Sequence, residues 1–332
     1  MTRVAVMGAG SWGTAFSLVL ADAGNDVDMW GRRPELCEQI TTGHENPEYL
    51  AGIKLPDTVL ASPDPADALT GASVAVLAVP SQTLRHNLQA WAPLLAPDVV
   101  LLSLMKGVER GTAKRMSEVI AEVTGAGPRR VGVVSGPNLA REIAERQPAA
   151  SVVACADEDV AARLQQLCHT AAFRPYTNTD VVGCELGGAT KNVIALAVGM
   201  AAGLGLGANA TASVITRGLA ETARLAQAAG ADPMTMAGLA GLGDLVATCS
   251  SPLSRNRTFG ERLGSGMSVE QVMASTRQVA EGMKSAESLR ELARRYSVDM
   301  PIVEHVTSVL RGELTPEQML ASLISRAATS ER

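Results

Sequence analysis

"RVAVMGAGSWGTA", residues 3–15, places a glycine-rich turn directly after a short apolar strand and directly before a helical pattern. In such a turn Gly8 permits the tight bend, Gly10 lets the backbone approach a pyrophosphate, and Gly13 lets the helix pack closely on the strand. The N-terminus of the helix then faces the phosphates. The same glycine spacing also occurs in turns that bind no ligand, but the flanking strand and helix favour a dinucleotide site.

Short apolar runs alternate with helical stretches through the first half of the chain, which is typical of a doubly wound parallel sheet. The predicted strands are RVAVMG, DVDMW, SVAVLAVP, DVVLLSLMKG, VGVVSGP and ASVVACA. From about residue 180 only helical patterns follow, expected at 180–202, 209–229, 233–249, 254–264, 268–276, 281–296, 301–311 and 315–326. We therefore expect an α/β, Rossmann-like domain over residues 1–179 and an all-α substrate-binding domain over residues 180–332.

Composition and charge exclude several classes of partner. The chain has 332 residues, 46% of them apolar, and a net charge of -5, so it offers no basic field for nucleic acid or for an anionic membrane. The apolar run 193–206 is interrupted by glycines at 199, 203 and 205, and we expect no stable membrane anchor. The chain moves from its first residues into a strand, with no pattern of a targeting signal. The five scattered cysteines form no CxxC, so we expect neither a disulfide framework nor a metal site, and the reducing cytoplasm fits best.

The end of the second predicted strand bears on the choice of cofactor. NAD-selective sites usually place an acidic residue there to bind the ribose hydroxyls. Here the strand continues into Arg32 and Arg33, and Asp28 lies too early to reach the ribose. Two guanidinium groups suit a 2′-phosphate, so we expect NADP(H) to be preferred and NAD(H) to be possible. A solvated pair of loop arginines is the alternative.

Lys191 stands at the start of an apolar run in "GGATKNVIALAVG", residues 187–199. Burial disfavours an ammonium group and can bring a lysine into the range of a general acid or base. A neighbouring Asp244 would oppose that shift while orienting the amine. The alternative is a lysine that snorkels to the surface from the first turn of a helix.

Other candidate residues lie where a doubly wound sheet holds its ligands, or where a helix begins. Lys106 and the Gly136–Asn138 turn follow predicted strands; Lys106 could instead be a surface lysine, and Asn138 could be a helix N-cap. Asp244 and Thr248 share a helix face. The group Ser254, Arg255 and Asn256 offers the donors that a phosphate needs, although Ser254 also suits an N-cap. Glu281 enters another helix, where the helix dipole alone would explain an acid.

Seven segments, in order, resemble those of the bacterial NAD(P)-dependent glycerol-3-phosphate dehydrogenases: GAGSWGTA, SLMKGVE, VSGPNLARE, ELGGATKNVIALAVG, GLGDLVATC, SRNRTFG and QVAEG. The resemblance covers essentially the whole chain. It implies reversible reduction of dihydroxyacetone phosphate to sn-glycerol 3-phosphate for phospholipid synthesis, a Rossmann domain followed by a helical substrate domain, and a dimer.

The resemblance also implies roles for individual residues. Lys191 would be the proton donor and acceptor, with Asn192 and Asp244 beside it. The implied substrate set is Lys106, Gly136, Ser254, Arg255 and Asn256, to which position adds Asn138, Lys191, Asp244 and Thr248. The implied cofactor contacts are Ser11, Trp12, Arg32, Arg33, Lys106, Ala140, Arg255, Val279 and Glu281, together with Gly8, Gly10 and Gly13. The chain departs from the family at Asn138, where Ser or Thr is usual, and at Leu139, where Phe is common.

Two other functions remain open from the sequence. A 2-ketopantoate or β-hydroxyacid reductase would share the glycine turn and a lysine, and "SRNR" could serve it as a carboxylate clamp. A non-catalytic NADP-sensing protein would not need Lys191, Asn192 and Asp244 together with a phosphate anchor. Turnover on a panel of the corresponding substrates separates the three.

Overall fold

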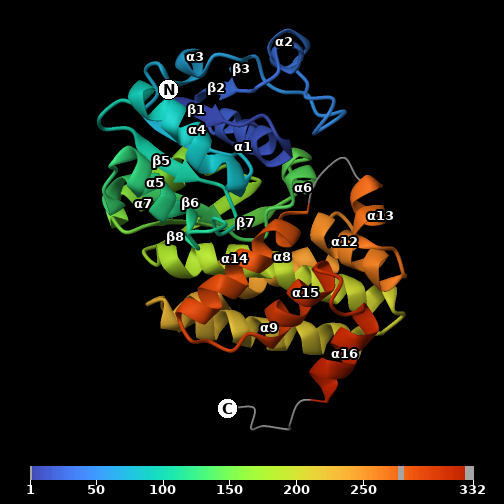
Figure 1. The fold of residues 1–332 in the computed structure, drawn as a ribbon. Coiled ribbons are helices and arrows are strands. Elements are labelled where there is room, and N and C mark those ends of the chain that lie inside the picture. Colours follow the sequence, from blue (N-terminus) through green and yellow to red (C-terminus); the bar gives the residue numbers. More distant parts are fainter. Residues whose placement is uncertain (1, 276–279, 326–332) are drawn as a thin grey trace.

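The chain forms an α/β half and a helical half that pack on one another (Figure 1). The computed structural model describes residues 2–275 and 280–325. The α/β half comprises the segments from blue to green in Figure 1, and the helical half those from yellow-green to red.

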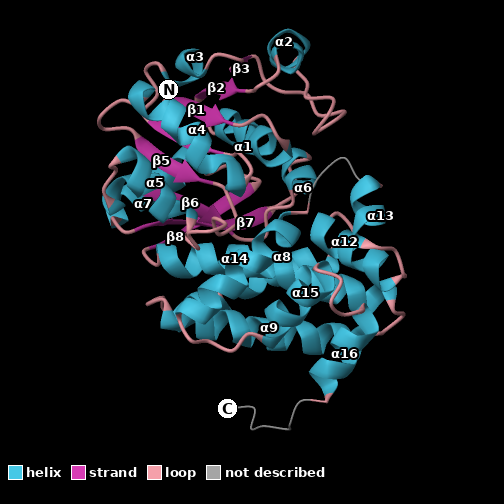
Figure 2. Ribbon diagram, in the orientation of Figure 1, coloured by secondary structure: helices cyan, strands magenta, loops and turns pink. Residues whose placement is uncertain are grey.

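An eight-stranded sheet lies at the centre of the α/β half (Figure 2). Its spatial order is β3-β2-β1-β4-β5-β6-β7-β8. The strands are β1 (Arg3–Met7), β2 (Asp26–Trp30), β3 (Val59–Ser62), β4 (Val74–Leu77), β5 (Val100–Ser103), β6 (Val131–Ser135), β7 (Ala149–Cys155) and β8 (Phe173–Asn178). The chain starts at the middle of the sheet, builds outward to β3, and then returns to continue on the other side of β1. This reversal creates the crevice at the carboxyl ends of β1 and β4 where such sheets bind nucleotides.

The sheet differs from the sequence prediction in two ways. β7 pairs antiparallel with β6, whereas the prediction was a wholly parallel sheet. β3 and β8 were not predicted. Both are edge strands, and their partly exposed residues break the continuous apolar run by which the buried strands were recognised.

Helices cover both faces of the sheet. They are α1 (Ser11–Asp22), α2 (Pro34–Gly43), α3 (Pro65–Leu69), α4 (Leu84–Trp91), α5 (Met116–Thr124), α6 (Ala140–Ala144) and α7 (Glu158–Cys168). Short 3-10 turns are η1 (Ser81–Thr83), η2 (Ala92–Leu94) and η3 (Pro128–Arg130).

The helical half is arranged around α8 (Val181–Gly203), of which residues 183–201 are all buried. Around it lie α9 (Ala208–Ala228), α10 (Pro233–Ala237), α11 (Asp244–Ser250), α12 (Arg255–Gly264), α13 (Val269–Ala274), α14 (Glu281–Arg295), α15 (Pro301–Leu310) and α16 (Pro316–Ile324). By length and composition α8 could cross a membrane, with a mean hydropathy of 1.3, but 89% of that window is buried inside the protein. Its apolar character is therefore explained by its place in the core.

One predicted helix is divided. Residues 233–249 were expected to form a single helix, but they form α10, a π-helical turn η4 (Leu239–Gly243) and α11. The interruption coincides with three glycines, at 238, 241 and 243, which weaken helix propensity. η4 packs against α8, where a side chain at Gly187 would overlap the backbone oxygen of Ala240.

Glycines also bring α8 and α12 into backbone contact. A Cβ atom at Gly199 would overlap the carbonyl oxygen of Arg257, and one at Gly260 would overlap that of Leu196. A packed interior transmits such overlap as strain, because neither backbone can move without disturbing the other.

Gly260→Ala is therefore expected to destabilise the protein. Overpacking typically costs about 1–3 kcal/mol, which outweighs the gain of about 1 kcal/mol from helix propensity. Chemical denaturation measures the change. Gly127→Ala is the matched control, because its φ is −67° and no described atom lies within 4 Å of the added Cβ. Equal stability of the two variants would contradict this account of the α8–α12 contact.

Candidate active site

The glycine turn has the geometry of a dinucleotide site. Gly8 has φ +140°, and a Cβ there would overlap the backbone of Ala78, which directly follows β4, the strand next to β1. A Cβ at Gly13 would overlap Gly8 itself, so α1 and β1 approach one another directly. At Gly10, by contrast, no described atom lies within 4 Å of an added Cβ, and the backbone is open to a ligand. The turn therefore fits a pyrophosphate lying against Gly10 at the start of α1.

A carboxylate shared by two lysines lies at the junction of the two halves. Lys191 Nζ donates to Asp244 Oδ1 at 2.5 Å and to Thr248 Oγ1 at 2.7 Å. Lys106 Nζ donates to Asp244 Oδ2 at 2.6 Å and to the Gly136 carbonyl oxygen at 2.8 Å. Lys106 follows β5 and Gly136 follows β6, whereas Lys191 lies on α8 and Asp244 begins α11. Residues far apart in the sequence are thus joined by one carboxylate.

Burial shows which of the alternative interpretations of these lysines are wrong. The Lys191 side chain is 10% exposed and that of Lys106 is 12% exposed, so Lys191 does not snorkel and Lys106 is not an ordinary surface lysine. Burial, together with the adjacent Lys191 ammonium, lowers the pKa of Lys106 to about 8, against the opposing attraction of Asp244. Two ammonium groups on one carboxylate leave positive charge for an anionic ligand.

A chain of amides extends from this cluster towards α12 and α14. Asn192 Nδ2 donates to the Lys106 carbonyl oxygen at 3.3 Å, and Asn192 Oδ1 accepts from Asn256 Nδ2 at 2.8 Å. Asn256 Oδ1 in turn accepts from the Gly282 N–H at 2.9 Å. Each amide has one defined orientation as a result. The chain places the start of α12 beside the buried lysines.

The N-cap interpretation of Ser254 is confirmed, while that of Asn138 is wrong. Ser254 Oγ accepts from the Arg257 N–H at 3.3 Å, at the N-terminus of α12. The N-cap of α6 is Leu139, not Asn138. Asn138 Oδ1 and Nδ2 are buried and have no hydrogen-bond partner among residues 2–275 and 280–325, and the same holds for Ser135 Oγ and Trp12 Nε1. Orphaned polar atoms beside the glycine turn and Lys106 are what a bound cofactor and substrate would satisfy.

The remaining predicted cofactor residues lie around the same crevice. Glu281 begins α14, where burial raises its pKa, opposed by the charge of Arg255 and by the Ser81 N–H. Ala140 begins α6, which packs against α1. Arg32 and Arg33 lie between β2 and α2, and Arg33 forms an ion pair with Glu48. Asp28 pairs with Arg3 at 2.7 Å inside the sheet. Val279 lies outside the described residues.

The contacts that hold the loop between β5 and α5, which carries Lys106, were not predicted from the sequence. Glu185, on α8, accepts from Arg115 Nη1 at 2.7 Å and from the Ser117 N–H at 2.7 Å, and burial raises the pKa of its carboxyl group. The signal was present, because Glu185 is an acid in the same apolar helix that made Lys191 conspicuous.

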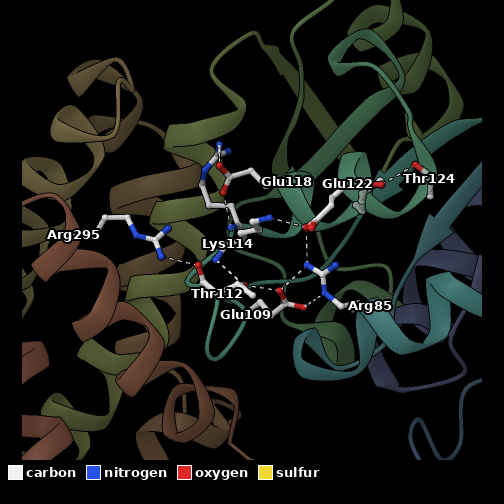
Figure 3. Close-up of polar contacts among 10 residues, drawn as sticks. Arg85, Glu109, Thr112, Lys114, Glu118, Glu122, Thr124 and Arg295 are labelled. Carbon is white, nitrogen blue, oxygen red and sulfur yellow. Dashed lines mark hydrogen bonds and ion pairs between the residues drawn. The ribbon is translucent and has the colours of Figure 1, made fainter.

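A second group of contacts holds the middle of that loop (Figure 3). Glu109 accepts two hydrogen bonds from Arg85, each at 2.9 Å, and Arg85 also reaches Glu122 at 2.8 Å. Arg295, from the helical half, donates to the Thr112 carbonyl oxygen at 2.7 Å. The Lys106 loop is therefore fixed to both halves of the protein.

A dinucleotide turn after β1, together with a buried lysine–aspartate cluster where the loops after β5 and β6 meet the helical half, indicates a nicotinamide-dependent oxidoreductase with a helical second domain. Models of the NAD-dependent glycerol-3-phosphate dehydrogenase N-terminus and C-terminus match residues 3–161 and 180–321. The chain belongs to this family, and it is an NAD(P)-dependent enzyme.

Individual relatives and structures agree with the family match. The chain is 64% identical to "Glycerol-3-phosphate dehydrogenase [NAD(P)+]" of Streptomyces griseus, over 99% of this chain and 98% of that protein. A protein of the same name from Thermobifida fusca is 63% identical over 100% of this chain and 99% of that protein. The crystal structure of glycerol-3-phosphate dehydrogenase from Coxiella burnetii superposes with a TM-score of 0.93 at 36% identity, covering 97% of this chain and 98% of that one. A ketopantoate reductase from Ralstonia eutropha, at 17% identity and a TM-score of 0.61, shares the fold alone.

We expect Lys106 to titrate near pH 8. Its ammonium is present below that pH and is lost as pH rises through it, whereas an ordinary lysine titrates near 10.4. Side-chain ¹³C NMR of lysine-labelled protein measures this, with the resonance assigned by its loss in Lys106→Arg. Asp244→Asn should lower the Lys106 pKa further, because the carboxylate opposes the other two effects. A Lys106 resonance that titrates like the exposed lysines would contradict the described geometry.

Proposed function

We propose that this enzyme catalyses the reversible NAD(P)H-dependent reduction of dihydroxyacetone phosphate to sn-glycerol 3-phosphate and so supplies glycerophospholipid synthesis. The observation that carries the proposal is the Asp244 carboxylate, which holds Lys106 and Lys191 together where the sheet meets the helical half. The names of the relatives supply the substrate.

Lys191 is the proposed proton donor in the direction of reduction. When bound, the cofactor supplies the hydride. Negative charge then develops on the former carbonyl oxygen, and the Lys191 ammonium stabilises this charge and delivers the proton. Asp244 and Thr248 accept hydrogen bonds from Lys191 Nζ and fix its direction. Asn192, one residue further along α8, links the lysines to the start of α12.

The substrate phosphate is proposed to lie at the N-terminus of α12. Ser254, Arg255 and Asn256 stand there, and the positive end of the helix dipole favours an anion. Lys106 adds a positive charge, and Asn138 offers an orphaned amide. Gly136 orients Lys106 through its carbonyl oxygen.

For the cofactor we propose a preference for NADPH over NADH. The pyrophosphate would lie against Gly10 and the first turn of α1, with Ser11, Trp12, Gly8, Gly13, Lys106, Ala140, Arg255, Val279 and Glu281 as the other contacts. The two arginines after β2, Arg32 and Arg33, suit a 2′-phosphate. A higher kcat/KM of the wild-type enzyme with NADH than with NADPH would contradict this preference.

Lys191→Ala is expected to reduce kcat for NADPH oxidation with dihydroxyacetone phosphate by at least ~10²-fold, because positioned proton transfer is typically worth ~10²–10⁴-fold. Circular dichroism and NADPH binding show whether the variant is folded. Lys54→Ala is the matched control, since its side chain is 74% exposed and bonds only to Glu45 and the Gly43 carbonyl oxygen among the described residues, so its kcat should be unchanged. Turnover of a folded Lys191→Ala protein near the wild-type level would defeat the assignment.

The same assay separates the alternative functions. Turnover of ketopantoate or 3-hydroxyisobutyrate, without turnover of dihydroxyacetone phosphate, would indicate a reductase of the type that shares only the fold. Cofactor binding by calorimetry without turnover of any of these substrates would indicate a sensor.

We also propose that the functional domains are residues 1–179 and 180–332, and that they meet at Asp180. The Asp180 side chain accepts from the Gly183 N–H at the start of α8 and from Thr235 Oγ1 of α10. A location in the cytoplasm suits the five buried thiols, which reducing conditions preserve, and cell fractionation measures it.

A homodimer is the proposed assembly. Exposed apolar side chains lie along η4, α11 and the loop after it: Leu242 is 40%, Val246 43% and Leu253 51% exposed. Clustered exposed apolar residues commonly mark interfaces. Sedimentation velocity should give twice the chain mass of 34.5 kDa, and Val246→Asp should shift the mass towards the monomer. A wild-type monomer at micromolar concentration would contradict the dimer.

A further inference from the structure

The segment from Asn46 to Tyr49, between α2 and β3, is fixed to the dinucleotide turn. Asn46 is fully buried, and its Nδ2 donates to the Ala9 carbonyl oxygen at 3.0 Å and to Thr14 Oγ1 at 2.8 Å. Ser11 Oγ donates to the Tyr49 carbonyl oxygen at 3.1 Å. Every one of these partners lies in or beside the glycine turn. The position of the segment relative to the cofactor site is therefore set by the fold.

This segment brings Glu48 to the end of β2. Glu48 Oε2 lies 2.5 Å from Arg33 Nη1, and the Arg33 guanidinium also lies over the Tyr49 ring, 5.8 Å from its centroid. The side chains of Arg33 and Glu48 are 47% and 46% exposed, so a ligand can reach both of them. The bond to Glu48 is also the main cause of the raised pKa of Arg33.

The place of this pair is the one that distinguishes NAD from NADP in doubly wound folds. A carboxylate there accepts hydrogen bonds from the adenine ribose, whereas an arginine accommodates a 2′-phosphate. Of the two acids of β2, Asp26 and Asp28, the one nearer the end of the strand is Asp28, and it is engaged by Arg3. Here the carboxylate and the guanidinium come from different segments, Glu48 from the loop after α2 and Arg33 from the end of β2.

We propose that Glu48 is a specificity-determining residue that balances NAD against NADP through Arg33. With NADH, the Glu48 carboxylate accepts a hydrogen bond from the ribose 2′-hydroxyl. With NADPH, the dianionic 2′-phosphate replaces Glu48 on Arg33. A half-exposed ion pair is weak enough for this exchange, and a phosphate dianion binds a guanidinium more strongly than a carboxylate does. The assignment rests on the proposed cofactor site and extends it.

Opposite substitutions in the pair should shift cofactor preference in opposite directions. Glu48→Gln removes both the competitor for Arg33 and the repulsion of the 2′-phosphate, and it weakens the contact with the ribose hydroxyl. We expect the ratio of Kd for NADH to Kd for NADPH to rise about fivefold to tenfold, as for loss of one close surface charge interaction. Arg33→Gln should lower the same ratio by a similar factor. Fluorescence titration of each variant with both reduced cofactors measures the four constants.

The control is Glu38→Gln, which removes the same charge from an exposed position of the neighbouring helix α2. The ratio of Kd for NADH to Kd for NADPH in this variant should stay close to that of the wild type. Competition by adenosine 2′,5′-bisphosphate and by 5′-AMP isolates the ribose end and should reproduce the shifts. Raising the ionic strength should reduce them, because exposed charges are screened.

Equal effects of Glu48→Gln and Glu38→Gln, or no effect of Glu48→Gln in a protein that binds NADPH, would overturn the proposal. Turnover of dihydroxyacetone phosphate is measured separately. Absence of turnover together with opposite shifts in the cofactor ratio would refute the proposed reaction and leave the role of Glu48 standing.

Discussion

The site depends on one fully buried carboxylate. Asp244 is 0% exposed, and each of its oxygens accepts from a different lysine. Removing one partner of a buried ion pair is strongly destabilising, typically by about 3–5 kcal/mol, because an uncompensated charge is left behind. Here two ammonium groups would be left beside one another. The loop after β5 contributes Lys106 and the helical half contributes Lys191, so the same contact that builds the site also joins the two halves.

The surroundings of Asp244 explain why α8 has its unusual composition. Glycines let η4 and α12 pack directly on its backbone, and its apolar residues form the core of the helical half. A helix enclosed in this way cannot shift to relieve the charge it carries. Lys191, Asn192 and Glu185 therefore stay at fixed positions, and each is matched by a partner from another element. Close packing therefore holds the polar residues of α8 in the positions where they meet their partners.

Much of the fold and of the site could be predicted, because the chemistry was local in sequence. The glycine turn, the alternating strands and helices, and the isolated lysine of α8 all have short-range patterns. What was missed depends on partners distant in the chain. The edge strands β3 and β8 are recognisable by pairing rather than by hydrophobicity, and the antiparallel direction of β7 has no sequence period of its own. The N-cap expected of Asn138 was wrong, because α6 starts one residue later, with Leu139 as its N-cap. Glu48 was not singled out, because only the fold brings it to Arg33.

The π-helical turn η4 has a consequence for the angular phase of the helix that follows it. Each residue of an α-helix advances about 100° around the axis, so one residue more or fewer per turn rotates everything downstream. A π turn holds one extra residue, and such turns are frequently found at functional sites. Immediately after η4, Asp244 faces α8, while Val246 on the same helix is 43% exposed. The extra residue of the widened turn thus sets the direction in which Asp244 projects from the helix axis, towards α8. Without the extra residue, Asp244 would be rotated by about 100° from its present direction towards α8.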